Sequence, residues 1–277
     1  MLTRRKFAGL VAGAVAASLT RRSAASALKP SGKRGACFTT KQGSGWLNRI
    51  DALNPSWMYS WGAFRPDTLP SVVEFTPMIW GNSSVDKLTS KIDRLRESKE
   101  RGEVRALLGF NEPDQESQSD MTVERVVELW PMLMDLGVPL VSPGCVHPDR
   151  EWMQEFMEEV ERRDLRVDAI AVHSYGGPDA EHLVRRLERV SRKYGRPIWL
   201  TEFAVGDWKA KRPEKNRFRP EKIATFMKEI LPALDAAPFV ERYAWFSASQ
   251  ESGPLGTSAL FDGQGKLTDL GRLYAQD

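Results

Sequence analysis

The chain of 277 residues has few of the residues that build disulfide frameworks or metal sites. It contains two cysteines, Cys37 and Cys145, and no CxxC pair, which excludes a disulfide-stabilised scaffold. Its three histidines, His147, His173 and His182, have no i, i+4 spacing. Zinc needs several such ligands together, so we expect no metal, and nothing indicates another cofactor. Both cysteines fall in or beside expected core strands, which favours buried thiols over a single disulfide.

The sequence also lacks a nucleotide-binding loop and a strong excess of charge. Residues 39–45, after the first expected strand, do not fit GxGxxG, and there is no Walker motif. The formal net charge is +3, and it would become −2 without the five basic residues among the first 27. A protein with so little positive charge is not expected to bind nucleic acid.

No apolar run is long enough to span a bilayer, which takes about 20 residues. Arg4-Arg5 precede a short apolar stretch over residues 7–19, and Ala25-Ser26-Ala27 offers a small-residue cleavage site. Residues 1–27 therefore resemble a twin-arginine export signal, the alternative being a basic tail with an alanine-rich helix. We expect a mature chain from about Leu28 that is not inserted in a membrane and works in the periplasm or outside the cell.

Eight short apolar runs alternate with helical patterns through the rest of the chain. Several runs are almost continuously apolar, which is typical of parallel strands buried on both faces. Trp152, Phe156 and Val160, at i, i+4 and i+8, are one example of the helical stripes between them. The pattern predicts one α/β domain over residues 28–277, a (β/α)8 TIM barrel with one or two short or missing helices. The expected strands cover residues 35–38, 57–61, 73–80, 104–110, 139–142, 167–173, 197–202 and 241–246.

Two of these runs lead to a glutamate. Glu112 follows the fourth expected strand, and Glu202 closes the seventh. The carboxyl ends of all strands of such a barrel meet at one face, so the two side chains should converge there. A pair of carboxylates can cleave a glycosidic bond by double displacement, one as nucleophile and the other as general acid and base. Taken singly, each glutamate could instead be a buried ion-pair partner.

The chain has nine tryptophans, and several fall at the ends of expected strands. Trp61, Trp80 and Trp245 are three of these, and flat rings at a barrel mouth suit the apolar faces of sugars. The alternative for each is packing in the core.

The segments around the glutamates resemble glycoside hydrolase family 128. This resemblance runs from about Lys33 to the C-terminus and rests on an ordered set of segments: residues 107–114 (LLGFNEPD), 142–144 (SPG), 167–176 (VDAIAVHSYG), 199–204 (WLTEFA) and 243–246 (YAWF). Proteins of this family are also described as having an alkali-sensitive-linkage-protein-like glycosyl hydrolase catalytic core. The resemblance implies a clan A-type retaining β-glucanase that acts on β-1,3-glucan, mostly in the endo mode.

The resemblance also implies a role for each site residue. Glu112 would be the general acid and base, Glu202 the nucleophile, and Asn111 a partner of the sugar 2-hydroxyl. His173 and Tyr175 would position Glu202 or a sugar hydroxyl, or form a buried hydrogen-bonded pair. The tryptophans would bind sugar rings, Trp245 beneath the cleaved bond and, in flanking subsites, Trp61, Trp80 and Trp208.

We therefore expect an exported, monomeric enzyme whose partner is a β-glucan. Two other interpretations stay open at this point. One is an exo-acting enzyme or a β-glycanase for another linkage, and the other is a glucan-binding wall protein without turnover.

Overall fold

The structure is a computed structural model that describes residues 32–275 apart from 42, 44 and 82. The described chain forms eight strands and seven α-helices. The expected export signal, residues 1–27, lies outside the described residues and stays a prediction. None of the helices in the described chain is both long and apolar enough to cross a membrane.

Each of the eight expected strands is present, and most are shorter than their apolar runs. The strands are β1 (Arg34–Cys37), β2 (Trp57–Tyr59), β3 (Glu74–Phe75), β4 (Leu107–Leu108), β5 (Leu140–Val141), β6 (Ile170–Ser174), β7 (Ile198–Phe203) and β8 (Val240–Phe246). The α-helices are α1 (Gly45–Leu53), α2 (Val85–Glu100), α3 (Val123–Met134), α4 (Glu151–Arg162), α5 (Ala180–Tyr194), α6 (Pro220–Ala236) and α7 (Asp269–Ala275). Two single 3-10 turns, η1 (Pro213–Lys215) and η2 (Gly256–Ser258), flank α6 and β8.

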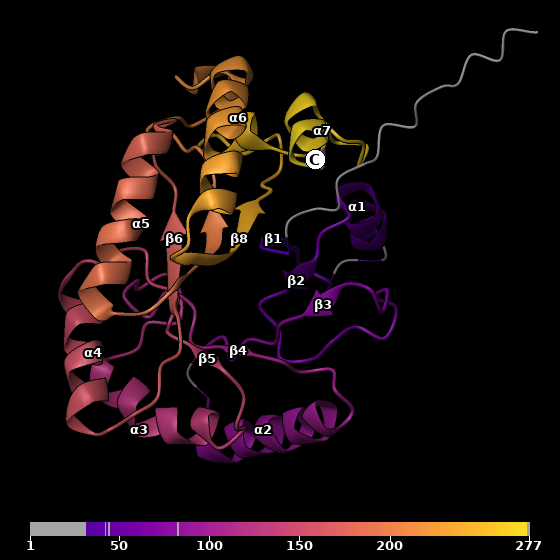
Figure 1. Cartoon of the computed structure of the whole chain (residues 1–277). Helices are drawn as coiled ribbons and strands as arrows, with labels where there is room; N and C mark the ends of the chain where they lie inside the picture. The colour runs from indigo at the N-terminus through magenta and orange to yellow at the C-terminus, as the bar shows by residue number, and fades with distance from the viewer. Residues whose placement is uncertain (1–31, 42, 44, 82, 276–277) are drawn as a thin grey trace, which may run out of the picture.

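The strands are parallel and form a ring with helices outside it (Figure 1). Six strands make one sheet in the order β3-β2-β1-β8-β7-β6, and β4 pairs with β5. Single parallel bridges join this pair to both edges of the sheet, Met78 to Leu108 beyond β3 and Val141 to Ala169 before β6. The α/β, TIM-barrel-like fold is thus as predicted. The β2–β3 connection has no helix in the described chain, which matches the expected missing helix.

Helix boundaries follow from local sequence. Thr122 precedes α3, and its hydroxyl accepts a hydrogen bond from the Arg125 amide at 3.2 Å. Helix α5 ends at Gly195, whose φ of 60° lies in the left-handed region that glycine adopts readily. Such signals end the helices where the chain must turn back towards the barrel.

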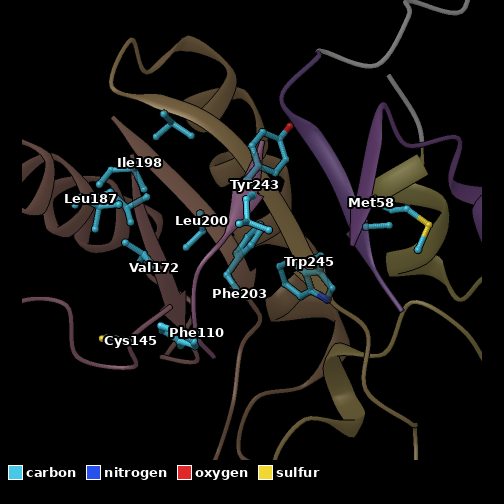
Figure 2. Packing of buried hydrophobic residues seen from close by; sticks show 14 of the residues in the cluster. Met58, Phe110, Cys145, Val172, Leu187, Ile198, Leu200, Phe203, Tyr243 and Trp245 are labelled. Atoms are coloured by element: carbon cyan, nitrogen blue, oxygen red, sulfur yellow. The ribbon is translucent and has the colours of Figure 1, made fainter. Parts of the chain in front are cut away.

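The core has two layers. Side chains that point outward from the strands pack under the helices, as Figure 2 shows for residues such as Leu200 and Phe203. A second cluster contains side chains from around the whole ring, several of them two residues apart on one strand, which is the spacing of one face of a strand. This inner cluster fills the barrel and combines large rings with alanines: Cys37, Trp57, Tyr59, Met78, Ala106, Leu108, Val141, Ala169, Ala171, Trp199 and Ala244.

Trp245 lies in the outer layer, so the expectation that it forms the floor beneath a sugar is wrong. Its side chain is 1% exposed, and its indole nitrogen donates to the carbonyl of Ser258 at 2.9 Å. Its ring packs edge-on against Phe203, beside which it lies in Figure 2. Side chains alternate along β8, and its neighbours Ala244 and Phe246 take the inward-facing positions.

Both cysteines are free and buried, as predicted. Cys37 belongs to the inner cluster and Cys145 to the outer one. They lie in separate layers of the core and contribute to its packing.

Gly35 on β1 gives a test of the packing inside the barrel. A Cβ atom there would come within 2.3 Å of the Trp57 ring. That ring cannot withdraw easily, because it is buried and its indole nitrogen donates to the Lys33 carbonyl at 2.9 Å. We expect Gly35→Ala to lower the free energy of unfolding by about 1–3 kcal/mol, measured by denaturant titration.

The matched control is Gly32→Ala. No atom lies within 4 Å of a Cβ at that position, so the change should stay within about 0.5 kcal/mol. Equal stability of the two variants would contradict the close approach of Trp57 to β1.

Candidate active site

A cleft of about 1230 Å³ opens at the carboxyl ends of the strands. This is the end of a barrel where catalytic residues gather. Every predicted site residue except Trp245 lines it: Trp61, Trp80, Asn111, Glu112, His173, Tyr175, Glu202 and Trp208. The cleft therefore collects side chains that are spread over about half of the sequence.

The two glutamates converge in this cleft. Glu112 follows β4, Glu202 lies on β7, and both are buried. One carboxylate oxygen of each, together with a ring nitrogen of His173, fall within 4.8 Å of one another. The predicted convergence of the two carboxylates is thus present, although their catalytic roles are not tested by geometry alone.

Three donors hold the carboxylate of Glu202. The hydroxyl of Tyr59 donates to Oε1 at 2.9 Å, and the indole nitrogen of Trp61 donates to the same oxygen at 2.8 Å. The hydroxyl of Tyr175 donates to Oε2. An ionised carboxylate, which only accepts hydrogen bonds, matches this set of donors.

The two tyrosines remain donors over a wide pH range. Burial raises the pKa of Tyr59 and of Tyr175 well above the usual value, and the charge of Glu202 raises both further. Each phenol therefore keeps its proton beside the carboxylate. Tyr59 and Trp61 come from β2 and its end, whereas Tyr175 follows β6, so Glu202 is held from two sides of the barrel.

His173 lies between the two glutamates and is fully buried. Its Nδ1 forms a hydrogen bond of 2.6 Å with Glu112 Oε1, and its Nε2 lies 3.5 Å from Glu202 Oε1, an ion-pair distance. Burial alone would lower the pKa of His173, but the charge of Glu202 and the bond to Glu112 outweigh it and raise the pKa. The protonated imidazole therefore places a positive charge between two negative ones.

The position of His173 depends on its neighbours in the barrel. Its Cα pairs with that of Glu202 across β6 and β7, so the two side chains start side by side. On the other side, a Cβ at Gly144 would come within 2.8 Å of His173 Nε2. The absence of a side chain in the Ser142-Pro143-Gly144 segment thus makes room for the imidazole.

The backbone at Glu112 is strained and well anchored. Its φ of 42° is unusual for a residue with a side chain, and Trp61 on the opposite part of the cleft has a φ of 56°. The Glu112 amide donates to the Gly144 carbonyl at 2.8 Å, and the Asn111 amide to the Trp80 carbonyl at 2.8 Å. Two neighbouring segments therefore fix the turn that carries Glu112.

Asn111 has hydrogen-bonding capacity left over for a ligand. Its amide nitrogen donates to Gln118 Oε1 at 3.2 Å, whereas its buried Oδ1 has no partner. A buried acceptor without a partner costs free energy, which a ligand hydroxyl could recover.

Exposed aromatic rings extend the cleft. Trp208 is 62% exposed, and its indole nitrogen donates to the carbonyl of Tyr175 at 3.1 Å. The Tyr175 ring packs edge-on against Trp208 and Phe246, and Trp80 is also exposed. Fixed and exposed indole faces of this kind can stack on sugar rings.

The cluster of Glu112, His173 and Glu202 also has the composition of a metal site. Two ligands of one tetrahedral zinc ion, each about 2.0 Å from the metal, would lie roughly 3.3 Å apart. The contact between His173 and Glu112 is 2.6 Å, the length of a charge-assisted hydrogen bond. This pair therefore fits a shared proton better than a shared metal ion.

Two residues of the cleft were missing from the sequence prediction. Tyr59 bonds to Glu202, and Phe246 lines the cleft where Trp245 was expected. The spacing of Trp57, Tyr59 and Trp61, two residues apart on one strand, was the signal for Tyr59. It placed a phenol on the same inward face as a residue already chosen.

Comparison with known proteins gives the class of this barrel. A family described as "Glycosyl hydrolase catalytic core" matches residues 35–274. Alkali-sensitive linkage protein 1 of Schizosaccharomyces pombe is 29% identical over 253 residues, which are 88% of this chain and 44% of that protein. The chain thus spans less than half the length of this curated relative.

Two solved structures refine the comparison. An endo-β-1,3-glucanase of glycoside hydrolase family 128, subgroup I, from Amycolatopsis mediterranei with laminarihexaose is 32% identical, with a TM-score of 0.73 over 88% of this chain and 98% of that one. A curdlan-specific exo-β-1,3-glucanase of subgroup III from Blastomyces gilchristii is 27% identical, with a TM-score of 0.69 over 90% and 99%. The chain belongs to the glycosyl hydrolase catalytic core family. Its predicted resemblance to glycoside hydrolase family 128 is confirmed.

The histidines allow a test of the charge at the centre of the cleft. We expect His173 to titrate above pH 6.5 and His147 below it, because the pKa of His147 is lowered by burial and by the charge of Arg150. The raised value means that His173 stabilises the fold fully below pH 6.5, and that this contribution is lost as the pH rises through its folded-state pKa.

The measurement is a heteronuclear NMR titration of the three imidazoles. Signals are assigned with His147→Gln and His182→Gln, which leave the pair of glutamates intact. A midpoint for His173 at or below that of His147 would contradict the placement of a positive imidazole between Glu112 and Glu202.

Proposed function

We propose that this protein is a retaining endo-β-1,3-glucanase. The observation that carries the proposal is the pair of buried carboxylates with oxygens within 4.8 Å of each other, in a cleft lined by exposed tryptophans. The similar enzyme from Amycolatopsis mediterranei was also solved as variants of two different glutamates with laminari-oligosaccharides. That relative supports both the choice of sugar and a role for two glutamates.

Glu202 would act as the nucleophile. Its carboxylate attacks the anomeric carbon, an ester bond forms to Glu202, and the bond from that carbon to the leaving sugar oxygen breaks. The hydrogen bonds from Tyr59, Trp61 and Tyr175 fix the attacking group before the substrate arrives.

Glu112 would be the general acid and then the general base. It gives its proton to the leaving oxygen, and afterwards takes a proton from the water that cleaves the ester. Retaining enzymes hold their carboxyl groups about 5–5.5 Å apart, whereas inverting ones need about 6.5–9.5 Å to admit a water. The short separation here supports retention of the anomeric configuration.

The size of the cleft supports the endo mode. A volume of about 1230 Å³ exceeds the roughly 300–1,000 Å³ of a pocket for one drug-sized ligand, so several sugar units can be accommodated. The exo mode of the Blastomyces gilchristii relative makes a terminal attack the second candidate.

Removal of the nucleophile tests the mechanism. We expect Glu202→Ala to lower kcat on laminarin at least about 10³-fold, because the ester can no longer form. Added azide should restore part of the activity by attacking the anomeric carbon directly, and the glycosyl azide should have the inverted, α configuration. The product is identified by NMR.

The matched control is Glu158→Ala, an exposed position on α4 far from the cleft in sequence, which should keep full activity. Wild-type activity in Glu202→Ala would remove Glu202 from the mechanism. A β-azide product from the same variant would assign the nucleophile elsewhere.

The mode of attack and the linkage are tested by product profiles. We expect laminarin and curdlan to yield mixed oligosaccharides early in the reaction, measured by chromatography, and xylan to yield none. A single small product from the first minutes would indicate the exo mode, and cleavage of xylan would indicate another linkage. Binding of laminarin without release of sugar would indicate a non-catalytic glucan-binding protein.

A further inference from the structure

One part of the cleft has a chemistry that the mechanism does not use. The loop after β5 and the start of α5 supply six titratable side chains to its lining, and we refer to this part as the polar arm. Its members are His147, Asp149, Arg150, Asp179, His182 and Arg186. The region around Glu202 is instead lined by rings such as Trp61, Tyr175 and Phe246.

The polar arm is fastened to the segment that carries the general acid. The amide of Glu112 donates to the Gly144 carbonyl at 2.8 Å. Two residues further on, the carboxylate of Asp114 accepts from the amides of Val146 at 3.3 Å and His147 at 3.2 Å. The polar arm therefore begins beside Glu112.

This position decides which part of a substrate the polar arm can meet. A general acid protonates the oxygen of the bond that breaks, so the leaving part of the substrate starts at that acid. The sugar that becomes attached to Glu202 lies on the other side of this oxygen. The leaving part of a glucan, towards its reducing end, therefore extends from Glu112 into the polar arm.

Several side chains of the polar arm are held in place. The side chain of Arg186 is 17% exposed, donates to the Val146 carbonyl at 3.2 Å and pairs with Asp149 at 3.3 Å. Asp179 accepts from the His182 amide at 2.8 Å at the start of α5. A surface that is ordered before binding loses less entropy when a ligand arrives.

The charges of the polar arm favour a neutral ligand. Its two arginines and two aspartates cancel, and burial together with the charge of Arg150 lowers the pKa of His147, so that this imidazole is neutral at pH 7. A neutral imidazole can both donate and accept a hydrogen bond, as can a sugar hydroxyl. An anionic polymer would gain no net attraction here.

We propose that the polar arm binds the glucosyl residues of the leaving group and thereby selects which bond of the glucan is cut. The inference rests on the proposed function and names the part of its substrate that each region of the cleft holds. Arg150, exposed at the start of α4, is the side chain whose removal disturbs the fold least.

The test compares two substrates in Arg150→Ala. Laminarihexaose has sugars on both sides of the cleaved bond, whereas 4-nitrophenyl β-laminaritrioside, cleaved at its aryl bond, has no sugar on the leaving side. We expect kcat/KM for laminarihexaose to fall about tenfold and its ratio to kcat/KM for the aryl substrate to fall by a similar factor. Laminarihexaose labelled with ¹⁸O at its reducing end should also be cut at different bonds.

The control is Arg185→Ala on α5, an exposed arginine that pairs with Glu181 and does not line the cleft. It should leave both the ratio and the cleavage positions unchanged. Equal losses on both substrates in Arg150→Ala, or no loss on either, would overturn the inference. A loss confined to carboxylated glucan would also overturn it, because the polar arm would then be an anion site.

Failure of the proposed function itself looks different. Wild-type protein that cleaves neither laminarihexaose nor the aryl substrate would refute the glucanase proposal, and the inference with it. Wild-type turnover of both substrates, with an unchanged ratio in Arg150→Ala, would refute the polar arm alone.

Discussion

Two carboxylates buried within 4.8 Å of each other repel, and the centre of this protein depends on how that repulsion is offset. His173 supplies a positive charge in contact with Glu112 and at ion-pair distance from Glu202. Tyr59, Trp61 and Tyr175 replace the water that Glu202 loses on burial. An isolated buried charge would be too costly, whereas this network gives each carboxylate partners and a fixed direction.

The barrel makes this network possible because it brings strand ends to one face. The donors to Glu202 come from β2 and β6, and the turn after β4 brings Glu112 opposite. Backbone strain at Glu112 and Trp61 is tolerated because hydrogen bonds and packing in the surrounding structure hold both segments. The same turn is fastened to the loop after β5, so the geometry of the acid and the shape of the polar arm are coupled.

Much of the fold could be predicted from the sequence. Continuous apolar runs marked all eight strands, and helical stripes marked the helices between them, because burial on both faces or on one face leaves a periodic pattern. The convergence of Glu112 and Glu202 followed from their places at strand ends. Trp245 was misplaced because neighbouring residues of a strand point to opposite faces, and an error of one position moves a ring from the cleft to the core.

The sequence by itself determined the parallel barrel, its single domain and the two carboxylates at its mouth, since these depend on apolar periodicity and order along the chain. Only the tertiary structure decided the partners of those carboxylates. Tyr59 and Glu202 are 143 residues apart and His173 and Glu112 are 61 apart, so their contacts depend on strand register and side-chain direction. The polar arm likewise joins two distant loops, and no local pattern in the sequence indicates that they share one cleft.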